Sequence, residues 1–280
     1  MRSLIALLLV CTIASADDVT PGKHPRIETA AGSGIFYDLI VPAAYAADPT
    51  AKLPVLFSQV TAKGASTFGH DAWAADEGVL LVAIYNNGDH GGGPGLDEIL
   101  MQDAVITHLE KTVRVHPCLR FSTGVSASAA RAMIMAKRHP TAHAGVLMTA
   151  HSGDSSGLPK HIAVAFAHGR KDEVHPISAV EASIATLKSM GNPLRWYFHD
   201  GGHDGTDKND RETGRRELHR LLSWMLWQSK LAHPGVPAAE RALYAKQAGE
   251  RIAAPTSPGQ AAFLDALMDV EAVKADKVLY

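Results

Sequence analysis

Residues 119–130 read LRFSTGVSASAA and join an apolar run directly to an alanine-rich run. The first half is suited to a buried strand and the second half to a helix. Between them, Gly124-Val125-Ser126-Ala127-Ser128 places a serine on a tight strand-to-helix turn, with small residues two positions before and after it. Such a turn presents the serine hydroxyl at the edge of a sheet, so Ser126 is the candidate nucleophile.

The helix that follows this turn bears on the chemistry of Ser126. Its first N–H, from Ala127, would face an oxyanion formed at the serine and stabilise the negative charge. Ser128 stands where glycine is usual in such turns, which leaves less room. A serine that only caps a core helix is the alternative interpretation, and the motif alone does not separate the two.

The same alternation continues on both sides of this stretch. Strands are expected over residues 35–41, 54–59, 79–85, 119–123, 145–149, 162–167 and 194–198, and helices over 96–114, 127–138, 177–190 and 210–227. Continuous apolar strands alternating with helices indicate a parallel sheet covered on both faces. The sequence therefore predicts an α/β fold, a three-layer sandwich around a mostly parallel, doubly wound sheet.

Ligands bind such sheets at the carboxyl ends of the strands, so the loops there are the place to seek partners for Ser126. A serine nucleophile needs a histidine base, and a carboxylate must hold that histidine in the right tautomer. Asp172 follows the strand at 162–167, and His203 follows the strand at 194–198. The order serine, carboxylate, histidine is the one expected for this sheet type, which favours Asp172 and His203 as the partners.

Other carboxylates compete for the orienting role. Asp154 follows the strand at 145–149, while Asp200 and Asp204 flank His203. A sequence neighbour on a glycine-rich turn rarely reaches the far nitrogen of the ring, so Asp172 is preferred. Ser122 lies inside a strand and is a poor nucleophile candidate.

A metal site is a further alternative. His199, Asp200, His203 and Asp204, with His90, are residue types that bind metal ions. Their spacing lacks the helical His-Glu-x-x-His frame, and the glycine-rich residues 91–95 follow no phosphate-binding pattern. The sequence therefore predicts neither a metal nor an organic cofactor.

The N-terminus has the layout of a secretory signal. Arg2 gives a positive start, residues 4–13 are apolar, and Ala14-Ser15-Ala16 offers a cleavage site. The run is short of the roughly 20 residues that span a bilayer, so no stable membrane span is expected after cleavage. The prediction is an exported protein, periplasmic or extracellular, with an uncleaved anchor or a lipid on Cys11 as alternatives.

Three segments follow from this pattern: a signal peptide over 1–16, a main domain over 17–231 and a helical C-terminal extension over 232–280. The extension begins with a proline- and glycine-containing linker at 233–237, and its helices are expected at 238–254 and 260–275. It would pack on the domain or bind a partner. After cleavage Cys118 is the single remaining cysteine, so no intrachain disulfide is expected.

Composition narrows the class of protein. Of the 280 residues, 46% are hydrophobic and 20% are charged, as in a packed globular domain. The net charge of -2 argues against a broad nucleic-acid surface. Nothing in the composition indicates an oligomeric state.

Together, Gly124–Ser128, residues 168–176 and Gly201–His203 resemble the α/β-hydrolase superfamily. Within it they are most similar to secreted poly(3-hydroxyalkanoate) depolymerases, feruloyl esterases and dienelactone-hydrolase-like proteins. Residues 36–42 and 73–79 resemble the early strand and the following helix of those families, and the likeness covers roughly residues 35–227. The resemblance implies hydrolysis of carboxylic esters, with Ser126, His203 and Asp172 as nucleophile, base and orienting carboxylate.

One feature departs from that family pattern. A His-Gly pair usually follows the strand at 54–59, and its loop supplies the second N–H that binds the oxyanion. Here the chain reads SQVTAKG over residues 58–64. A main-chain N–H near Val60 or Thr61, or the Gln59 side chain, would have to serve instead. Since losing one donor costs about 10²–10³ in rate, a weak or inactive enzyme is an alternative.

Two other functions remain open. A binding or scaffold protein on a hydrolase fold would use its C-terminal helices, and a serine peptidase of prolyl-oligopeptidase type would use the same three residues on amides. The sequence shows no propeller domain of the kind that such peptidases carry, which makes the peptidase the less favoured of the two. About a dozen residues separate the strands at 145–149 and 162–167, too few for a helical lid. An open cleft is therefore expected, and it suits bulky or polymeric esters better than small buried ones.

Overall fold

The computed structural model describes residues 19–86, 96–204 and 210–253. The expected signal peptide, His90 with the glycine-rich residues 91–95, and the helix expected at 260–275 lie outside the described residues. Among the described residues, no helix is long and apolar enough to cross a membrane.

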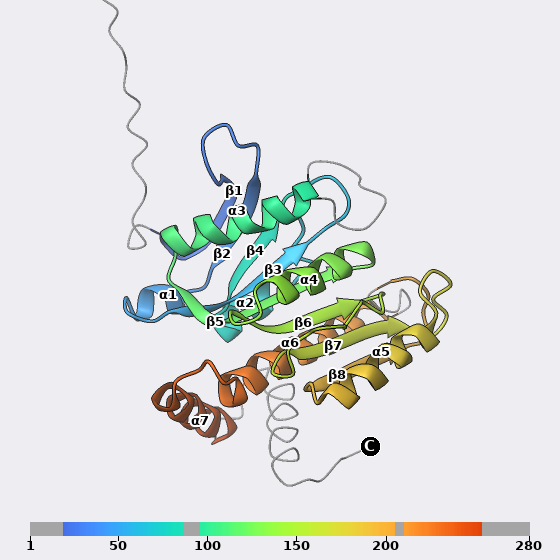
Figure 1. Cartoon of the computed structure of the whole chain (residues 1–280). Helices are drawn as coiled ribbons and strands as arrows, with labels where there is room; N and C mark the ends of the chain where they lie inside the picture. Colours follow the sequence, from blue (N-terminus) through green and yellow to red (C-terminus); the bar gives the residue numbers. More distant parts are fainter. Residues whose placement is uncertain (1–18, 87–95, 205–209, 254–280) are drawn as a thin grey trace, which may run out of the picture.

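Eight strands form one sheet in the order β1-β2-β4-β3-β5-β6-β7-β8 (Figure 1). They are β1 (Gly22–Glu28), β2 (Phe36–Val41), β3 (Leu53–Gln59), β4 (Leu80–Ile84), β5 (Val115–Val125), β6 (His143–Thr149), β7 (Ala163–Gly169) and β8 (Leu194–His199). The pairs β1–β2 and β2–β4 are antiparallel, and every pair from β4 to β8 is parallel. The mostly parallel sheet predicted from the sequence is confirmed.

Helices cover both faces of this sheet. They are α1 (Ala44–Ala47), α2 (Asp71–Glu77), α3 (Leu96–Thr112), α4 (Ala127–Arg138), α5 (Ile177–Met190), α6 (Arg211–Ala232) and α7 (Ala238–Ala253). Helices α3, α4 and α5 lie on one face, and α2 and α6 lie on the other (Figure 1). The result is the predicted three-layer sandwich.

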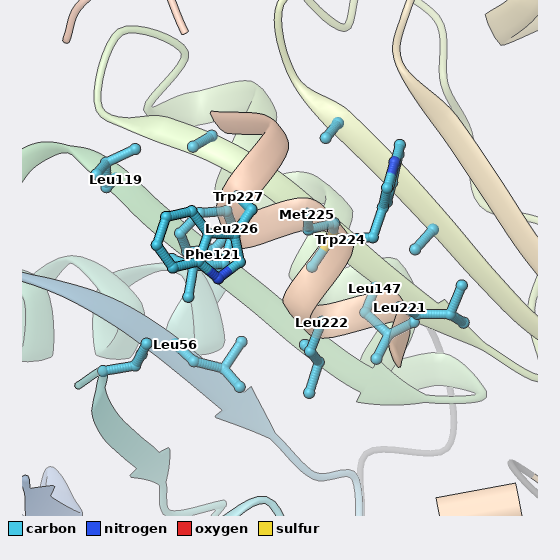
Figure 2. Packing of buried hydrophobic residues seen from close by; sticks show 14 of the residues in the cluster. Leu56, Leu119, Phe121, Leu147, Leu221, Leu222, Trp224, Met225, Leu226 and Trp227 are labelled. Carbon is cyan, nitrogen blue, oxygen red and sulfur yellow. The ribbon is translucent and has the colours of Figure 1, made fainter. Parts of the chain in front are cut away.

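The central strands are apolar throughout because both of their faces are buried. In β3, Leu56 faces the α6 layer, whereas its neighbours Val55 and Phe57 face the α3 layer. Figure 2 shows the α6 side, where residues 221–227 pack over Phe121 and Leu147. This double burial explains why the central strands show no polar alternation in sequence.

Strand β1 was not predicted, and its sequence, GKHPRIE, shows why. It is an edge strand that pairs with β2 alone, and most of its residues are exposed or half-buried. Its register shifts between His24 and Ile27, where Arg26 adopts a positive φ of 51°. Pro25 is tolerated at such an edge because no second neighbour requires its missing N–H. An edge strand without a buried face carries no hydrophobic period to detect.

The described part of the C-terminal segment packs on the sheet domain. Val236, Tyr244 and Ala248 join the hydrophobic cluster that contains Trp227 of α6. Helix α6 runs on to Ala232, beyond its expected end at 227, so α6 reaches the linker before α7. The proposed division at residue 232 remains a prediction.

Candidate active site

Strand β5 ends in a strained turn that carries Ser126. The serine has φ 56° and ψ -131°, a backbone conformation that L-residues rarely adopt. A Cβ on Gly124 would overlap the backbone of Ser128, so only glycine fits two residues before the serine. The N–H of Ser126 donates to Thr149 O at 2.9 Å, which ties the turn to β6. This is the geometry of a nucleophile elbow.

Ser128 is part of the same turn rather than an obstacle to it. Its buried hydroxyl donates to Val125 O at 2.6 Å and accepts from Val125 N–H at 2.8 Å. The serine that replaces the usual glycine therefore closes the elbow with two hydrogen bonds to the main chain of one residue, Val125. The small size expected at this position is kept, and a polar role is added that the sequence pattern did not reveal.

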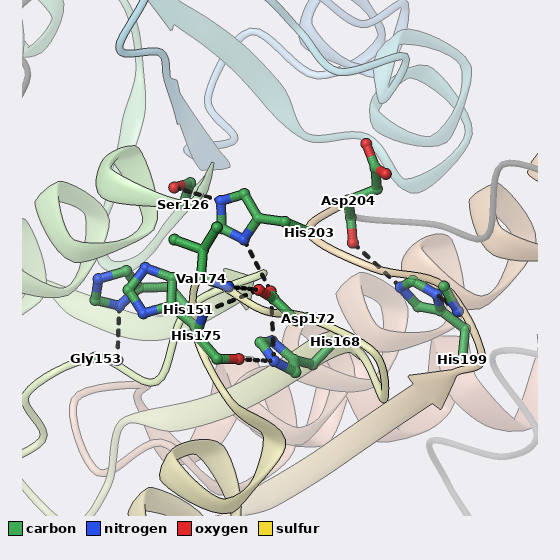
Figure 3. Close-up of polar contacts among 11 residues, drawn as sticks. Ser126, His151, Gly153, His168, Asp172, Val174, His175, His199, His203 and Asp204 are labelled. Atoms are coloured by element: carbon green, nitrogen blue, oxygen red, sulfur yellow. Dashed lines mark hydrogen bonds and ion pairs between the residues drawn. The ribbon is translucent and has the colours of Figure 1, made fainter.

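The structure brings Ser126, His203 and Asp172 into one hydrogen-bonded chain (Figure 3). Ser126 Oγ lies 2.8 Å from His203 Nε2, and His203 Nδ1 lies 2.9 Å from Asp172 Oδ2. An ionised carboxylate accepts the Nδ1 proton, which leaves Nε2 free to accept the serine proton. The three residues come from the loops after β5, β7 and β8, at the carboxyl edge of the sheet.

Asp172 is held as an ionised acceptor. Its side chain is buried, and Oδ1 accepts the N–H groups of Val174 and His175, each at 2.8 Å. Burial opposes ionisation, but the hydrogen bonds from His175, His203 and Val174 outweigh it and lower the pKa of Asp172. Its loop meets the histidine loop closely: a Cβ on Gly169 would overlap the carbonyl groups of Gly201 and Gly202.

Two further histidines lie beside His203, and the sequence analysis did not single them out. The His175 ring is centred 5.5 Å from that of His203, and the His151 ring is centred 4.2 Å from that of His175. Burial and the neighbouring imidazoles lower the pKa of His151 to about 4, and they lower the pKa of His175 too. Both rings are therefore neutral at neutral pH. Both histidines follow a parallel strand at its carboxyl end, and this position in the sequence could have indicated that they lie near the site.

His168 supports the Asp172 loop from below. It is fully buried, and its Nε2–H donates to His175 O at 2.7 Å. The same nitrogen lies 3.6 Å from Asp172 Oδ2. Burial, the largest effect, lowers the pKa of His168, so the ring is a neutral donor that fixes the loop carrying the carboxylate.

Two of the rival carboxylates, those of Asp154 and Asp200, face basic side chains away from His203. Asp154 is exposed and pairs with Lys137 of α4 at 2.7 Å. Asp200 is exposed and lies 3.8 Å from Arg170. His199 turns its Nε2 to the main-chain carbonyl of Asp204 at 3.2 Å. In the described ranges, no group of three or more His, Cys, Asp or Glu side chains is arranged to hold a metal ion.

The candidate oxyanion donors lie at two places. Ala127 is the first residue of α4, where helix N–H groups have no partner within the helix. The Val60 carbonyl accepts from Arg131 Nη1 at 2.7 Å, which anchors the loop after β3. The Gln59 side chain is not brought to Ser126: its Oε1 accepts from Gln102 Nε2 at 2.7 Å, and its Nε2 contacts Met135 Sδ at 3.9 Å. Side chains alternate between the two faces of β3, and Gln59 lies on the same face as Val55 and Phe57, where it contacts α3 and α4.

No family model matches the sequence, and no curated protein matches it either. Solved structures do match the fold. A thermostable esterase aligns with a TM-score of 0.54 at 16% identity, over 68% of this chain and 58% of that one. A ferulic acid esterase aligns at 0.56 and 15%, over 74% and 97%. Dipeptidyl peptidase 4 of Porphyromonas gingivalis aligns at 0.57 and 14%, over 71% and 35%.

These similarities concern the fold. The chain spans just over half of the thermostable esterase, about a third of the peptidase and nearly all of the ferulic acid esterase. The α/β-hydrolase fold implied by the sequence resemblance is confirmed.

Proposed function

We propose that this chain, which has the α/β-hydrolase fold, is a serine hydrolase of carboxylic esters. The observation that carries the proposal is the hydrogen-bonded chain from Ser126 through His203 to Asp172. Three residues far apart in sequence meet at hydrogen-bonding distances, and the ionised Asp172 beside Nδ1 favours the His203 tautomer that nucleophilic catalysis requires. Their meeting on a strained elbow argues against a serine that only caps a helix.

The proposed reaction proceeds in two halves. Ser126 Oγ attacks the ester carbonyl carbon while His203 Nε2 takes the serine proton, and Asp172 stabilises the imidazolium that forms. The tetrahedral oxyanion collapses to an acyl-enzyme as His203 returns the proton to the leaving alcohol. Water then attacks the acyl carbonyl carbon while His203 Nε2 takes its proton, and the second tetrahedral oxyanion collapses to the free acid as His203 returns that proton to Ser126 Oγ. The Ala127 N–H stabilises the oxyanion in both halves.

The substrate class rests on two supports. The ferulic acid esterase match extends over nearly all of that protein, whereas the peptidase match extends over about a third. Residues 150–162, which join β6 to β7, contain no helix, and this supports a site without a helical lid at that connection. We infer an open cleft that accepts bulky or polymeric esters. We also infer that the enzyme is exported. A peptidase is the second candidate, because the same three residues cleave amides.

A fluorophosphonate probe tests the reaction class directly. We expect one probe per molecule on the wild type, none on Ser126→Ala, and full labelling of Ser156→Ala, which changes an exposed serine of the β6–β7 connection. Absence of labelling in folded wild type would overturn the proposal and favour a binding protein. Aryl, feruloyl and hydroxyalkanoate esters assayed beside dipeptide amides then separate an esterase from a peptidase.

A further inference from the structure

We propose that Arg131 and Asn86 are positioning residues that orient the Thr61 N–H as the second oxyanion donor. This inference rests on the proposed function, since it supplies the donor that the missing His-Gly pair leaves unassigned. It goes beyond that function by naming which peptide serves and which side chains hold it.

The loop after β3 is held by its carbonyl groups. Arg131 Nη1 donates to Val60 O at 2.7 Å, and Asn86 Nδ2 reaches the same oxygen at 3.2 Å. Asn86 Nδ2 also donates to Thr61 O at 2.7 Å. Farther along the loop, the main chains of Gly64 and Asn86 exchange hydrogen bonds of 2.9 and 2.8 Å. The loop is therefore fixed at successive peptides rather than at one point.

Fixing a carbonyl also fixes the N–H that shares its peptide plane. In a trans peptide, the C=O of one residue and the N–H of the next point in opposite directions. All described peptides are trans, so the Val60 carbonyl directed at Arg131 turns the Thr61 N–H away from Arg131. Within the described residues, that N–H has no hydrogen-bond partner. It is thus a half-buried main-chain donor left available at the carboxyl end of β3, beside β5 in the sheet.

One helix sets both halves of this arrangement. Helix α4 begins at Ala127, the first donor, and Arg131 follows four residues later, about one helical turn along the same face. Helix α4 therefore both carries the first donor and, through Arg131, holds the loop that carries the second, so this one rigid element fixes the distance between the two donors. Oxyanion stabilisation depends on donors held within about 2.7–3.1 Å of the developing charge, so a small shift of the loop matters.

The Arg131 side chain is itself held in place. It is 3% exposed and forms an ion pair with Glu98 of α3, which is also buried. Beside it, Gln102 of α3 joins Gln59 of β3 to the Arg131 main-chain carbonyl, the latter at 3.5 Å. Buried ion pairs are seldom worth more to stability than apolar residues of the same volume. A positioning role gives this pair a function that stability alone does not.

The test uses Arg131→Lys and Asn86→Ala, with Arg120→Lys as the matched control. Arg120 is likewise a buried arginine that pairs with a glutamate, the exposed Glu110, but it lies in the middle of β5, level with Val55 of β3 rather than with the loop after β3. In folded protein we expect kcat to fall about 10-fold to 100-fold in the two test variants, with KM within about twofold. Removing a donor outright costs roughly 10²–10³. The control is expected to lose stability and to keep its kcat.

A transition-state analogue supplies the second readout. The affinity for a trifluoromethyl ketone, which forms a tetrahedral adduct with the serine, should fall by the same factor as kcat/KM in each test variant. An unchanged kcat in folded Arg131→Lys and Asn86→Ala, in a protein whose Ser126 still reacts with the fluorophosphonate, overturns this inference alone. Wild type that fails to react removes both this inference and the proposed function. If Arg131→Lys does not fold, Asn86→Ala decides.

Discussion

Asp172 accepts hydrogen bonds on both carboxylate oxygens, and this dual role distinguishes it from the other acidic candidates. One oxygen accepts the N–H groups of Val174 and His175, and the other accepts the His203 ring. The first set orients the carboxylate and the second orients the base. Asp154, by contrast, is exposed and pairs with a lysine of α4. At the scale of single residues, the site depends on how completely each polar atom is partnered.

Asp172→Asn should lower kcat/KM by about 10⁴, because an amide nitrogen facing His203 Nδ1 favours the wrong tautomer. Asp154→Asn is the matched control and is expected to retain the wild-type value. Initial rates on an activated aryl ester measure both. A large loss in Asp154→Asn with little loss in Asp172→Asn would assign the orienting role to the rival.

Helix α7 shows how a peripheral element is attached to the sheet domain. Glu77 of α2 is buried and accepts from Ser223 and Trp227 of α6, at 3.1 Å each. Arg251 of α7 reaches the same carboxylate, with contacts of 2.6 and 3.1 Å. Lys230 lies nearby and is buried, and burial lowers its pKa to about 8. A shared buried carboxylate therefore joins α2, α6 and α7.

Arg251→Met should lower the free energy of unfolding by about 2 kcal/mol, because it removes the partner of a buried charge. The expected loss is below the roughly 3–5 kcal/mol of a fully buried pair, since Arg251 is 23% exposed and Lys230 remains close. Lys246→Met breaks an exposed pair with Glu250 in the same helix and should cost under about 0.5 kcal/mol. Urea unfolding measures both, and equal losses would contradict the shared-carboxylate model.

The molecule as a whole contains buried histidines that affect its response to acid. His70, His143 and His233 are at most 3% exposed. Burial, the largest effect in each, lowers the pKa of His70 and His143 to about 3 and that of His233 to about 4. The unfolded chain binds protons at these rings from about pH 6.5 downward, whereas the folded chain does not. These three rings therefore do not oppose folding above pH 6.5, and they lower the free energy of unfolding increasingly as the pH falls from 6.5 toward 4.

We expect the free energy of unfolding to decrease between pH 6.5 and 4.5, approaching about 1.4 kcal/mol per pH unit for each of these histidines. Urea midpoints measured across that range, together with proton uptake on unfolding, check the slope. His143→Gln removes one titrating ring and should reduce the slope by up to about 1.4 kcal/mol per pH unit. Stability that stays constant from pH 7 to 5 would show that these rings are protonated in the folded protein.

Local pattern determined much of this protein. The alternation of apolar strands and helices, the turn around Ser126 and the chain order of Ser126, Asp172 and His203 are all visible in sequence. They are visible because a buried strand or helix needs particular residue types at short intervals, and because parallel strands end at one edge. The polar edge strand β1 carries no such period and was missed for that reason.

Tertiary structure decided which side chains meet. Glu77 and Arg251 are 174 positions apart, and Arg131 reaches Val60 across 71 positions because β3 and β5 are neighbours in the sheet. The same packing turns Gln59 into the α3–α4 layer, away from the role that its place after an apolar strand suggested. Such contacts depend on strand order and on which face of an element is buried against which layer. Local sequence determines the elements and their faces, while the assembled sheet determines the partners.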